Sequence, residues 1–144
     1  MELYSHWADV PPAKDVDSEL FWAGIERGEL LVSRCGTCKR LVYPETSSCP
    51  HCGTIGETRS FESIPPTGLV YTWTTVHVAL DPAFKGETPY TVLAVDFGPD
   101  VRILGRLLDK PDELRGDSEV YLVPYKVGAQ ALPGFRFTAT QGRP

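Results

Sequence analysis

The chain has no long apolar run and few basic residues. None of its apolar stretches approaches the 18 or so residues that span a bilayer, and its first residues lack the basic-then-apolar pattern of a signal peptide. We therefore expect no membrane span and a cytoplasmic location. The chain has fourteen lysines and arginines and nineteen aspartates and glutamates, which gives a net charge of −5 and a pI near 5.1. Because nucleic-acid binding draws much of its free energy from Lys and Arg, nucleic acid is not the expected partner.

Internal repeats and low-complexity tracts are also missing from the sequence. Of the 144 residues, 42% are hydrophobic and 23% are charged, which is ordinary for a globular protein. A chain of this length buries roughly 70% of its unfolded surface when it folds. The composition therefore predicts one compact domain with at most one small additional module.

Cysteine is confined to one segment. All four cysteines lie between Cys35 and Cys52, as two Cys-x-x-Cys pairs with ten residues between them. In a reducing compartment such pairs are metal ligands or redox groups more often than disulfides, and a thioredoxin-like site needs only one pair. A c-type haem is excluded because Lys39 and Gly53, not histidine, follow the two pairs.

The spacing of the two pairs predicts a metal ribbon. Each pair forms a tight turn that grips one edge of a tetrahedron, and a short hairpin brings the two turns together. Zinc is the expected ion, and iron is the alternative because it also accepts four thiolates. Four thiolates fill the coordination sphere, so the site should be structural and not catalytic. The predicted ligands are Cys35, Cys38, Cys49 and Cys52. His51, inside the second turn, is expected to be an exposed spacer.

A short amphipathic helix is predicted before the ribbon. In "DSELFWAGIERGEL" a capping residue precedes apolar residues at helical spacing, and Gly28 is the expected C-terminal stop. The aromatic pair Phe21 and Trp22 packs onto its own domain in one interpretation and binds a partner in the other. Residues 1–16 are expected to form an extended arm because they contain two consecutive prolines.

Strand patterns dominate the chain after the ribbon. They are rich in β-branched and aromatic residues, and a linker with the sequence "ESIPPTG" precedes them. Five such strands predict a small OB-type barrel, in which Gly105 would make a bulge or a bend. The predicted strands cover residues 69–78, 90–97, 101–108, 119–127 and 134–140. The predicted fold is mainly β, with an N-terminal arm and helix (1–30), a rubredoxin-like zinc ribbon (31–64) and a five-stranded OB-fold (65–144).

The order of these motifs resembles the acyl-CoA-associated family known as domain of unknown function thirty-five. The resemblance covers residues 18–137 and rests on the helix "FWAGIERGEL", the ribbon "RCGTCKRLVYP…CPHCG" and the barrel segments "GLVYTWTTVH", "PAFKGETPYTVLAVDF" and "LPGFRF". Members of that family join a rubredoxin-like zinc ribbon to an OB-fold. The four cysteines of this chain match the family's metal ligands.

The resemblance implies an accessory role in acyl-CoA chemistry. Such proteins associate with thiolase-superfamily enzymes, including acetyl transferases, hydroxymethylglutaryl-CoA synthases and lipid-transfer-protein-type aldolases that act on sterol side-chain thioesters. Some are fused to MaoC-like enoyl-CoA hydratases. We therefore expect a non-catalytic subunit that binds and stabilises a thiolase-like enzyme, as two copies on a partner dimer, and helps to form its acyl-CoA entrance. A thiolase, an acyltransferase, an aldolase and a hydratase all stay open as partners, and the chain is either a free subunit or an excised module.

The sequence offers no nucleophile paired with a base, so no catalytic residue is predicted. His77, at the end of a predicted strand, is interpreted as structural, and Asp81 and Glu87 as parts of a solvated loop. The basic residues beside the first cysteine pair either hold the phosphates of CoA or form a solvated cluster. These residues are Arg34, Lys39 and Arg40. The expected partner interface contains the aromatic residues Phe21, Trp22, Tyr43 and Phe84.

A zinc ribbon joined to an OB-fold is also an architecture that grips single-stranded nucleic acid. The aromatic residues of the barrel would then serve as stacking platforms for bases. The basic groove that should accompany them is missing from the sequence, so the charge favours the accessory subunit over this alternative.

Overall fold

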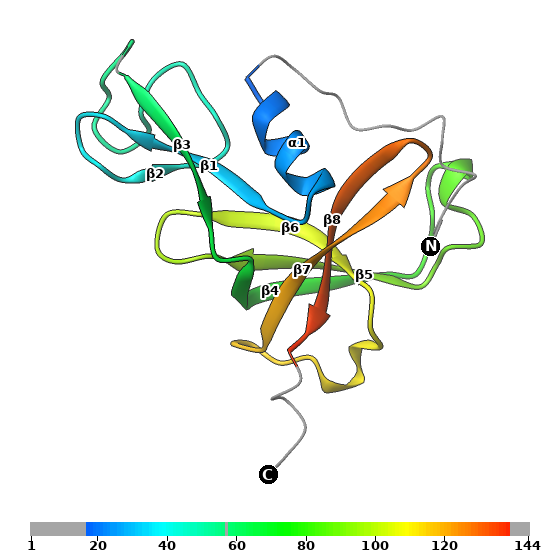
Figure 1. Cartoon of the computed structure of the whole chain (residues 1–144). Helices are drawn as coiled ribbons and strands as arrows, with labels where there is room; N and C mark the ends of the chain where they lie inside the picture. The colour runs from blue at the N-terminus through cyan, green and yellow to red at the C-terminus, as the bar shows by residue number, and fades with distance from the viewer. Residues whose placement is uncertain (1–16, 57, 139–144) are drawn as a thin grey trace.

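The structure is a computed structural model that describes residues 17–56 and 58–138, so the expected arm of residues 1–16 lies outside the described residues. A helix, a three-stranded sheet and a five-stranded barrel follow one another along the chain (Figure 1). The helix and the small sheet comprise α1 (Glu19–Glu26), β1 (Leu30–Cys35), β2 (Leu41–Val42) and β3 (Arg59–Ile64). The barrel comprises β4 (Thr67–Val76), β5 (Tyr90–Asp96), β6 (Arg102–Leu107), β7 (Glu119–Val127) and β8 (Gln130–Phe137), with the 3-10 turns η2 (Pro82–Phe84) and η3 (Pro111–Glu113) in its connections. The predicted mainly β fold is confirmed.

Helix α1 stops where the sequence predicted, because Gly28 adopts a left-handed φ of 74°. The N–H of Gly28 donates to the carbonyl of Ile25 at 3.0 Å, and the N–H of Glu29 donates to the carbonyl of Gly24 at 2.9 Å. These two bonds form a Schellman motif, which satisfies the last carbonyls of the helix. The helix then contacts both β1 and β8, so it joins the small sheet to the barrel. Within the described ranges, no helix combines the length and the apolar character that crossing a membrane requires.

The small sheet has the strand order β2-β1-β3, with β1 antiparallel to both neighbours. The stretch "ESIPPTG" is therefore not all linker, because β3 continues to Ile64, which pairs with Leu30. Only Pro65 and Pro66 separate β3 from β4. The sequence of β3 does not look like a strand because several of its side chains are polar. Its pairing with β1 stabilises the strand where local propensity does not.

The barrel has the closed strand order β4-β5-β6-β8-β7. All neighbours are antiparallel except β6 and β8, which are parallel, and this is the topology of an OB-fold. Strand β8 begins at Gln130, four residues before the predicted start at residue 134, because Gly128 takes a φ of 58° and turns the chain tightly after β7. Pro133 interrupts the strand pattern in the sequence, yet it lies opposite Pro124 in the ladder, where neither residue needs to donate.

Gly105 does not make the bulge that the sequence suggested. The pairing of β5 with β6 passes Gly105 without a shift in register, and a register shift lies instead between Val70 and Thr72 of β4. A Cβ atom on Gly105 would lie 2.4 Å from Cε2 of Phe135 and 2.7 Å from the carbonyl oxygen of Pro133. The glycine therefore makes room for a fully buried aromatic ring inside the barrel.

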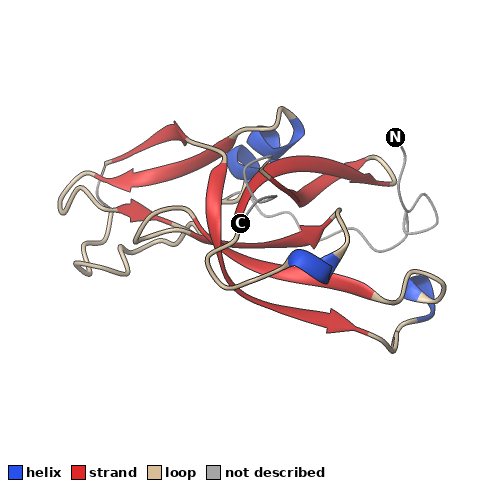
Figure 2. Ribbon diagram, turned by 90° about the horizontal axis from the view of Figure 1, so that it is seen from below, coloured by secondary structure: helices blue, strands red, loops and turns tan. Residues whose placement is uncertain are grey.

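One hydrophobic core crosses the boundary between the small sheet and the barrel. It contains Ile25 of α1 and Leu30 of β1 together with Leu93 and Phe135 of the barrel, all of them fully buried. The β4–β5 hairpin leaves this core and carries η2 at the end of the molecule opposite the small sheet (Figures 1 and 2). The two ends of the molecule thus differ: the small sheet bears the cysteines, and the hairpin ends in a loop that exposes two apolar side chains, Val78 and Leu80.

Candidate metal centre

The two cysteine pairs have the same backbone pattern. The N–H of Lys39 donates to the carbonyl of Cys35 at 3.0 Å, and the N–H of Gly53 donates to the carbonyl of Cys49 at 2.9 Å. Both donors have a positive φ, 65° for Lys39 and 75° for Gly53. Glycine adopts this conformation without strain, whereas lysine adopts it at a steric cost of about 1 kcal/mol. The repeated turn places the sulfur atoms of both pairs on one side of the ribbon.

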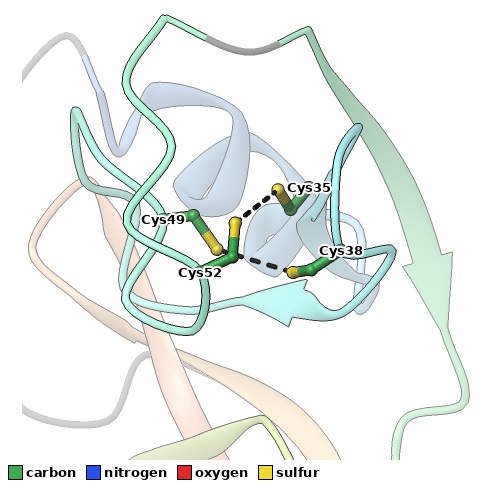
Figure 3. Close-up of side chains that lie close together, drawn as sticks. All are labelled: Cys35, Cys38, Cys49 and Cys52. Atoms are coloured by element: carbon green, nitrogen blue, oxygen red, sulfur yellow. Dashed lines mark hydrogen bonds between the residues drawn. The ribbon is translucent and has the colours of Figure 1, made fainter.

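The four sulfur atoms face one another (Figure 3), and all lie within 4.8 Å of each other. The Sγ atoms of Cys35 and Cys52 are 3.8 Å apart, and those of Cys38 and Cys49 are 3.7 Å apart. A tetrahedral zinc ion with Zn–S bonds of about 2.3 Å holds its sulfur atoms about 3.8 Å apart. The arrangement therefore fits one zinc ion held by four thiolates, with no coordination position left for water or substrate. The predicted structural zinc ribbon is confirmed.

The environment favours the thiolate form of Cys52 but not that of Cys38. The hydrogen bond with the Arg40 backbone lowers the pKa of the Cys38 thiol, but desolvation and hydrogen bonds with the other three sulfur atoms outweigh it and raise this pKa to about 11. Cys35 and Cys49 are buried, and Cys52 is exposed. The hydroxyl of Thr54 lies 3.2 Å from the Sγ atom of Cys52, and hydrogen bonds from Thr54 lower the pKa of the Cys52 thiol to about 6. The N–H of Thr37 donates to the Sγ atom of Cys35 at 3.4 Å. These contacts orient the ligands from outside the metal site.

Two of the predicted basic residues are already engaged beside the metal. The guanidinium of Arg34 donates to both carboxylate oxygens of Glu62, at 3.1 Å from Nε and 2.5 Å from Nη2. This hydrogen bonding holds the pKa of Glu62 below its usual range. The ammonium of Lys39 donates to the carbonyl of Gly36 at 2.6 Å. A phosphate that bound here would therefore compete with Glu62 for Arg34.

The third basic residue, Arg40, contacts a carboxylate that sequence reasoning missed. Its Nε donates to Asp100 Oδ1 at 3.0 Å, and the side chain of Asp100 is only 9% exposed. The hydrogen bond from Arg40 holds the pKa of Asp100 below its usual range. His51 is not an exposed spacer, because its Nε2 lies 2.9 Å from the carbonyl oxygen of Leu41 and 4.0 Å from Asp100 Oδ1. Asp100 lies in the β5–β6 connection, so it ties the ribbon to the barrel.

Three of the four predicted interface aromatics pack together, and the fourth lies elsewhere. The ring centroid of Phe21 is 5.2 Å from that of Trp22 and 5.0 Å from that of Tyr43. Phe21 is 8% exposed, while Trp22 and Tyr43 are partly buried against the main core. Phe84 belongs to η2, and its ring centroid lies 6.2 Å from that of Tyr90. The structure therefore shows two separate aromatic groups.

The residues considered for catalysis lie around the β4–β5 hairpin. His77 follows β4 and is exposed, and Asp81 precedes η2. Oε2 of Glu87 lies 3.7 Å from Nη2 of Arg106. Among the described residues, the four cysteines are the group of three or more His, Cys, Asp or Glu side chains whose ligand atoms converge as a metal site requires. The metal-binding residues predicted from the sequence therefore lie together in the ribbon.

Comparison with known families matches both parts of the fold. The profile described as the rubredoxin-like zinc ribbon domain of ChsH2 matches residues 22–54, and the profile described as the C-terminal OB-fold domain of ChsH2 matches residues 62–129. Fold and metal site together define a zinc-ribbon and OB-fold protein. More narrowly, the chain belongs to the ChsH2 family, whose fold is that of the DUF35 proteins.

Curated proteins that resemble the chain include a hydratase subunit and a scaffold protein. A probable enoyl-CoA hydratase alpha subunit from Thermomonospora curvata is 32% identical over 129 residues, which cover 87% of this chain and 39% of that protein. A DUF35 domain-containing scaffold protein from Methanothermobacter thermautotrophicus is 26% identical over 110 residues, covering 76% of this chain and 81% of that protein. The chain thus spans about two fifths of the hydratase subunit but most of the scaffold protein.

Solved structures that share the fold include an aldolase and a DUF35 protein. A chain of the Ltp2-ChsH2(DUF35) aldolase superposes with a TM-score of 0.75 at 29% identity, covering 88% of this chain and 98% of that chain. A DUF35 protein of unknown function from Sulfolobus solfataricus superposes with a TM-score of 0.64 at 16% identity, covering 91% and 92%. The second likeness shows the fold alone.

Proposed function

We propose that this chain is a non-catalytic accessory subunit of a thiolase-superfamily acyl-CoA enzyme in the cytoplasm. The observation that carries the proposal is the match to a chain of the Ltp2-ChsH2(DUF35) aldolase, which extends over 98% of that chain. The names of the two curated relatives, a scaffold protein and a hydratase subunit, also describe proteins that act in assemblies. The partner reaction is a thiolase, acyltransferase or sterol side-chain aldolase reaction, and a MaoC-like hydratase is a second component.

The zinc site supports a structural role for the ribbon. All four coordination positions belong to cysteines of this chain, so the ion has no place to polarise a substrate or activate water. Its contribution is to fold the ribbon, because the free energy of binding a structural metal is also free energy of folding. The partner enzyme then supplies the catalytic groups, and this chain supplies the surfaces that bind the partner and the ligand.

The strongest candidate for a docking element is the loop after β4. Leu80 is 98% exposed and Val78 is 73% exposed, and we call these two residues the hairpin tip. Large apolar side chains that water surrounds on one loop are suited to insert into a hollow of a partner, where desolvation of a few anchors supplies most of the binding free energy. Phe84, one of the four aromatic residues predicted for the interface, packs against Tyr125 and Val127 and lines a pocket together with both residues of the hairpin tip.

The basic residues beside the zinc site remain the proposed contact to CoA. Arg34, Lys39 and Arg40 lie on one ribbon surface, and the two arginine side chains are 37% and 51% exposed. In the assembled complex a CoA phosphate would share Arg34 with Glu62. The double substitution Arg34→Ala with Lys39→Ala should weaken CoA thioester binding to the complex in calorimetry. Unchanged binding would mean that Arg34 and Lys39 face solvent and do not contact CoA.

The test of the accessory role is co-expression with the thiolase-like enzyme encoded nearest to this chain. We expect the two proteins to co-elute in size-exclusion chromatography, and the carbon–carbon bond chemistry of the partner to rise when this chain is present. Equal solubility and activity with and without the chain, together with separate elution, would contradict the proposal. Tight, salt-sensitive binding to single-stranded DNA would support the nucleic-acid alternative instead.

A further inference from the structure

A cavity of about 220 Å³ lies between α1 and the small sheet, and we call it the aromatic cavity. Aromatic residues from α1, from the residue after β2 and from β3 line it. These residues are Phe21, Trp22, Tyr43 and Phe61. Sites for whole small molecules typically begin at about 300 Å³, so a cavity of this size suits one chemical group of a ligand.

The rings that line the aromatic cavity stand at angles to one another. The plane of the Phe21 ring makes an angle of 76° with that of Trp22 and 45° with that of Tyr43. Inclined rings form a concave wall and not a flat stack. Phe61 is 40% exposed, so part of its ring is open to a ligand. The face of an aromatic ring is negative, and it attracts a cation that lies within about 6 Å of its centre.

The charged residues that line the aromatic cavity are carboxylates. They are Asp17 and Glu45, and no described lysine, arginine or histidine joins them in the lining. Glu45 accepts hydrogen bonds from Ser33 and Arg59, so Arg59 balances its charge. Asp17 is exposed, and within the described residues no hydrogen bond or ion pair engages its carboxylate. The unbalanced charge at the cavity is therefore negative, which favours a cation and opposes an anion.

The acceptors in the lining decide which cation fits. A primary ammonium group carries three N–H donors, and it loses free energy on entry unless each donor finds an acceptor. The hydroxyl of Ser33 and the carboxylate of Glu45 already bond to each other, which leaves few side-chain acceptors. A quaternary ammonium group has no N–H donor, and its methyl groups pack directly against aromatic rings. The walls therefore favour a quaternary ammonium group over a lysine side chain.

We propose that the aromatic cavity binds the quaternary ammonium group of a small molecule. The methyl groups contact the rings of Phe21, Trp22 and Phe61, and the carboxylate of Asp17 balances the charge. The site belongs to this chain alone, so it does not depend on the proposed accessory function, and its failure would leave that function intact.

The experiment is a titration of the full, zinc-loaded chain with choline, followed by backbone and indole N–H chemical shifts. We expect saturable shifts at Trp22, Tyr43 and Phe61. The alcohol 3,3-dimethylbutan-1-ol has the shape of choline without its charge, and it should bind roughly fivefold more weakly because the cation–π attraction is lost. Ethanolamine keeps the charge as a primary ammonium group, and it should also bind more weakly than choline.

Two variants separate the roles of the rings and the charge. Phe61→Leu removes an aromatic face and keeps the residue apolar, so it should weaken choline binding severalfold. The matched control is Tyr121→Leu, since Tyr121 is 38% exposed on β7 outside the cavity, and it should bind choline like the unmodified chain. Asp17→Asn should weaken the binding of choline and leave that of the neutral alcohol unchanged.

The proposal would be overturned by the absence of saturable choline shifts at the aromatic cavity, or by equal binding of choline and the neutral alcohol. Unchanged choline binding by Phe61→Leu would also overturn it. If Phe61→Leu does not fold, Asp17→Asn decides in its place, because Asp17 is exposed and its loss should not affect the fold. Tighter binding of ethanolamine than of choline would overturn the assignment to a quaternary ammonium group.

Discussion

Asp100 joins two parts of the chain that are 60 residues apart in the sequence. Its carboxylate accepts from Arg40 of the ribbon, and it lies in the connection between two barrel strands. Sequence analysis did not single out Asp100, because nothing local in "GPD" indicates a partner in a distant segment. The four zinc ligands could be predicted for the opposite reason, since two short spacings within one segment encode the site.

Replacing Asp100 with asparagine should destabilise the protein at neutral pH. The hydrogen bond from Arg40 lowers the pKa of Asp100 in the folded state. The carboxylate therefore stabilises the fold above its unfolded pKa, and the contribution is lost as pH falls through the lower folded value. We expect Asp100→Asn to lower the Tm by a few degrees at pH 7, with a difference that shrinks below about pH 4. Asp112→Asn, in exposed η3, is the control, and an equal loss there would contradict the prediction.

Replacing Cys49 with serine should remove the zinc ion. Cys49 is 2% exposed, and its sulfur closes one edge of the tetrahedron with Cys38. Metal analysis should find about one zinc ion per unmodified chain, and the variant should lose it together with the order of the ribbon. Ser47→Ala, exposed in the same loop, should keep the metal. If protein prepared without chelator carries no metal, the assignment of a metal site is contradicted. If it carries iron, the site binds iron and not zinc.

Strand β6 depends on a residue that has no side chain. We expect Gly105→Ala to destabilise the barrel by about 2 kcal/mol, because its Cβ would lie 2.4 Å from the ring of Phe135 and 2.7 Å from a backbone oxygen. Gly116→Ala meets no atom within 4 Å and should be neutral. Chemical denaturation of the two variants measures the difference. Equal stability of both variants would show that the barrel expands around Phe135 at little cost.

The β4–β5 hairpin should carry the contact to the partner. Leu80→Asp places a charge on a residue that is 98% exposed, so the fold should not change while burial in an interface becomes unfavourable. We expect co-elution with the thiolase-like enzyme to be lost and the Tm of the isolated chain to stay the same. Leu104→Asp is the matched control, because Leu104 is 65% exposed on β6 of the barrel. Release of the partner by Leu104→Asp alone would move the interface to that strand.

The elements differ in how well the sequence predicts them. Helix α1 and β7 match their predicted positions because each carries its own periodic pattern and ends at a recognisable stop. Strand β3 and the first residues of β8 were missed, since polar side chains in one and Pro133 in the other conceal strands that form only through their neighbours. The cavity that Thr75, Arg106 and Arg136 help to line was also not predicted, because these residues come together only when the barrel closes.

We expect one copy of this chain to bind each subunit of a dimeric partner enzyme. A thiolase-like dimer presents the same surface twice, so each half should hold one copy of this 15.9 kDa chain. Light scattering on the purified complex should give the mass of the partner dimer plus two copies. One copy per dimer would mean that the binding surface crosses the two-fold axis of the partner.

The continuous core has a consequence for how the protein melts. Ile25 and Leu30 pack in the same cluster as Leu93 and Phe135 of the barrel, so α1 and β1, which ends at the zinc ligand Cys35, cannot lose their order without exposing the barrel core to water. Zinc bound at the ribbon therefore raises the melting temperature of the barrel as well, by mass action on a single transition. A preparation with incomplete metal loading would melt as two populations, and the ratio of their amplitudes would measure zinc occupancy.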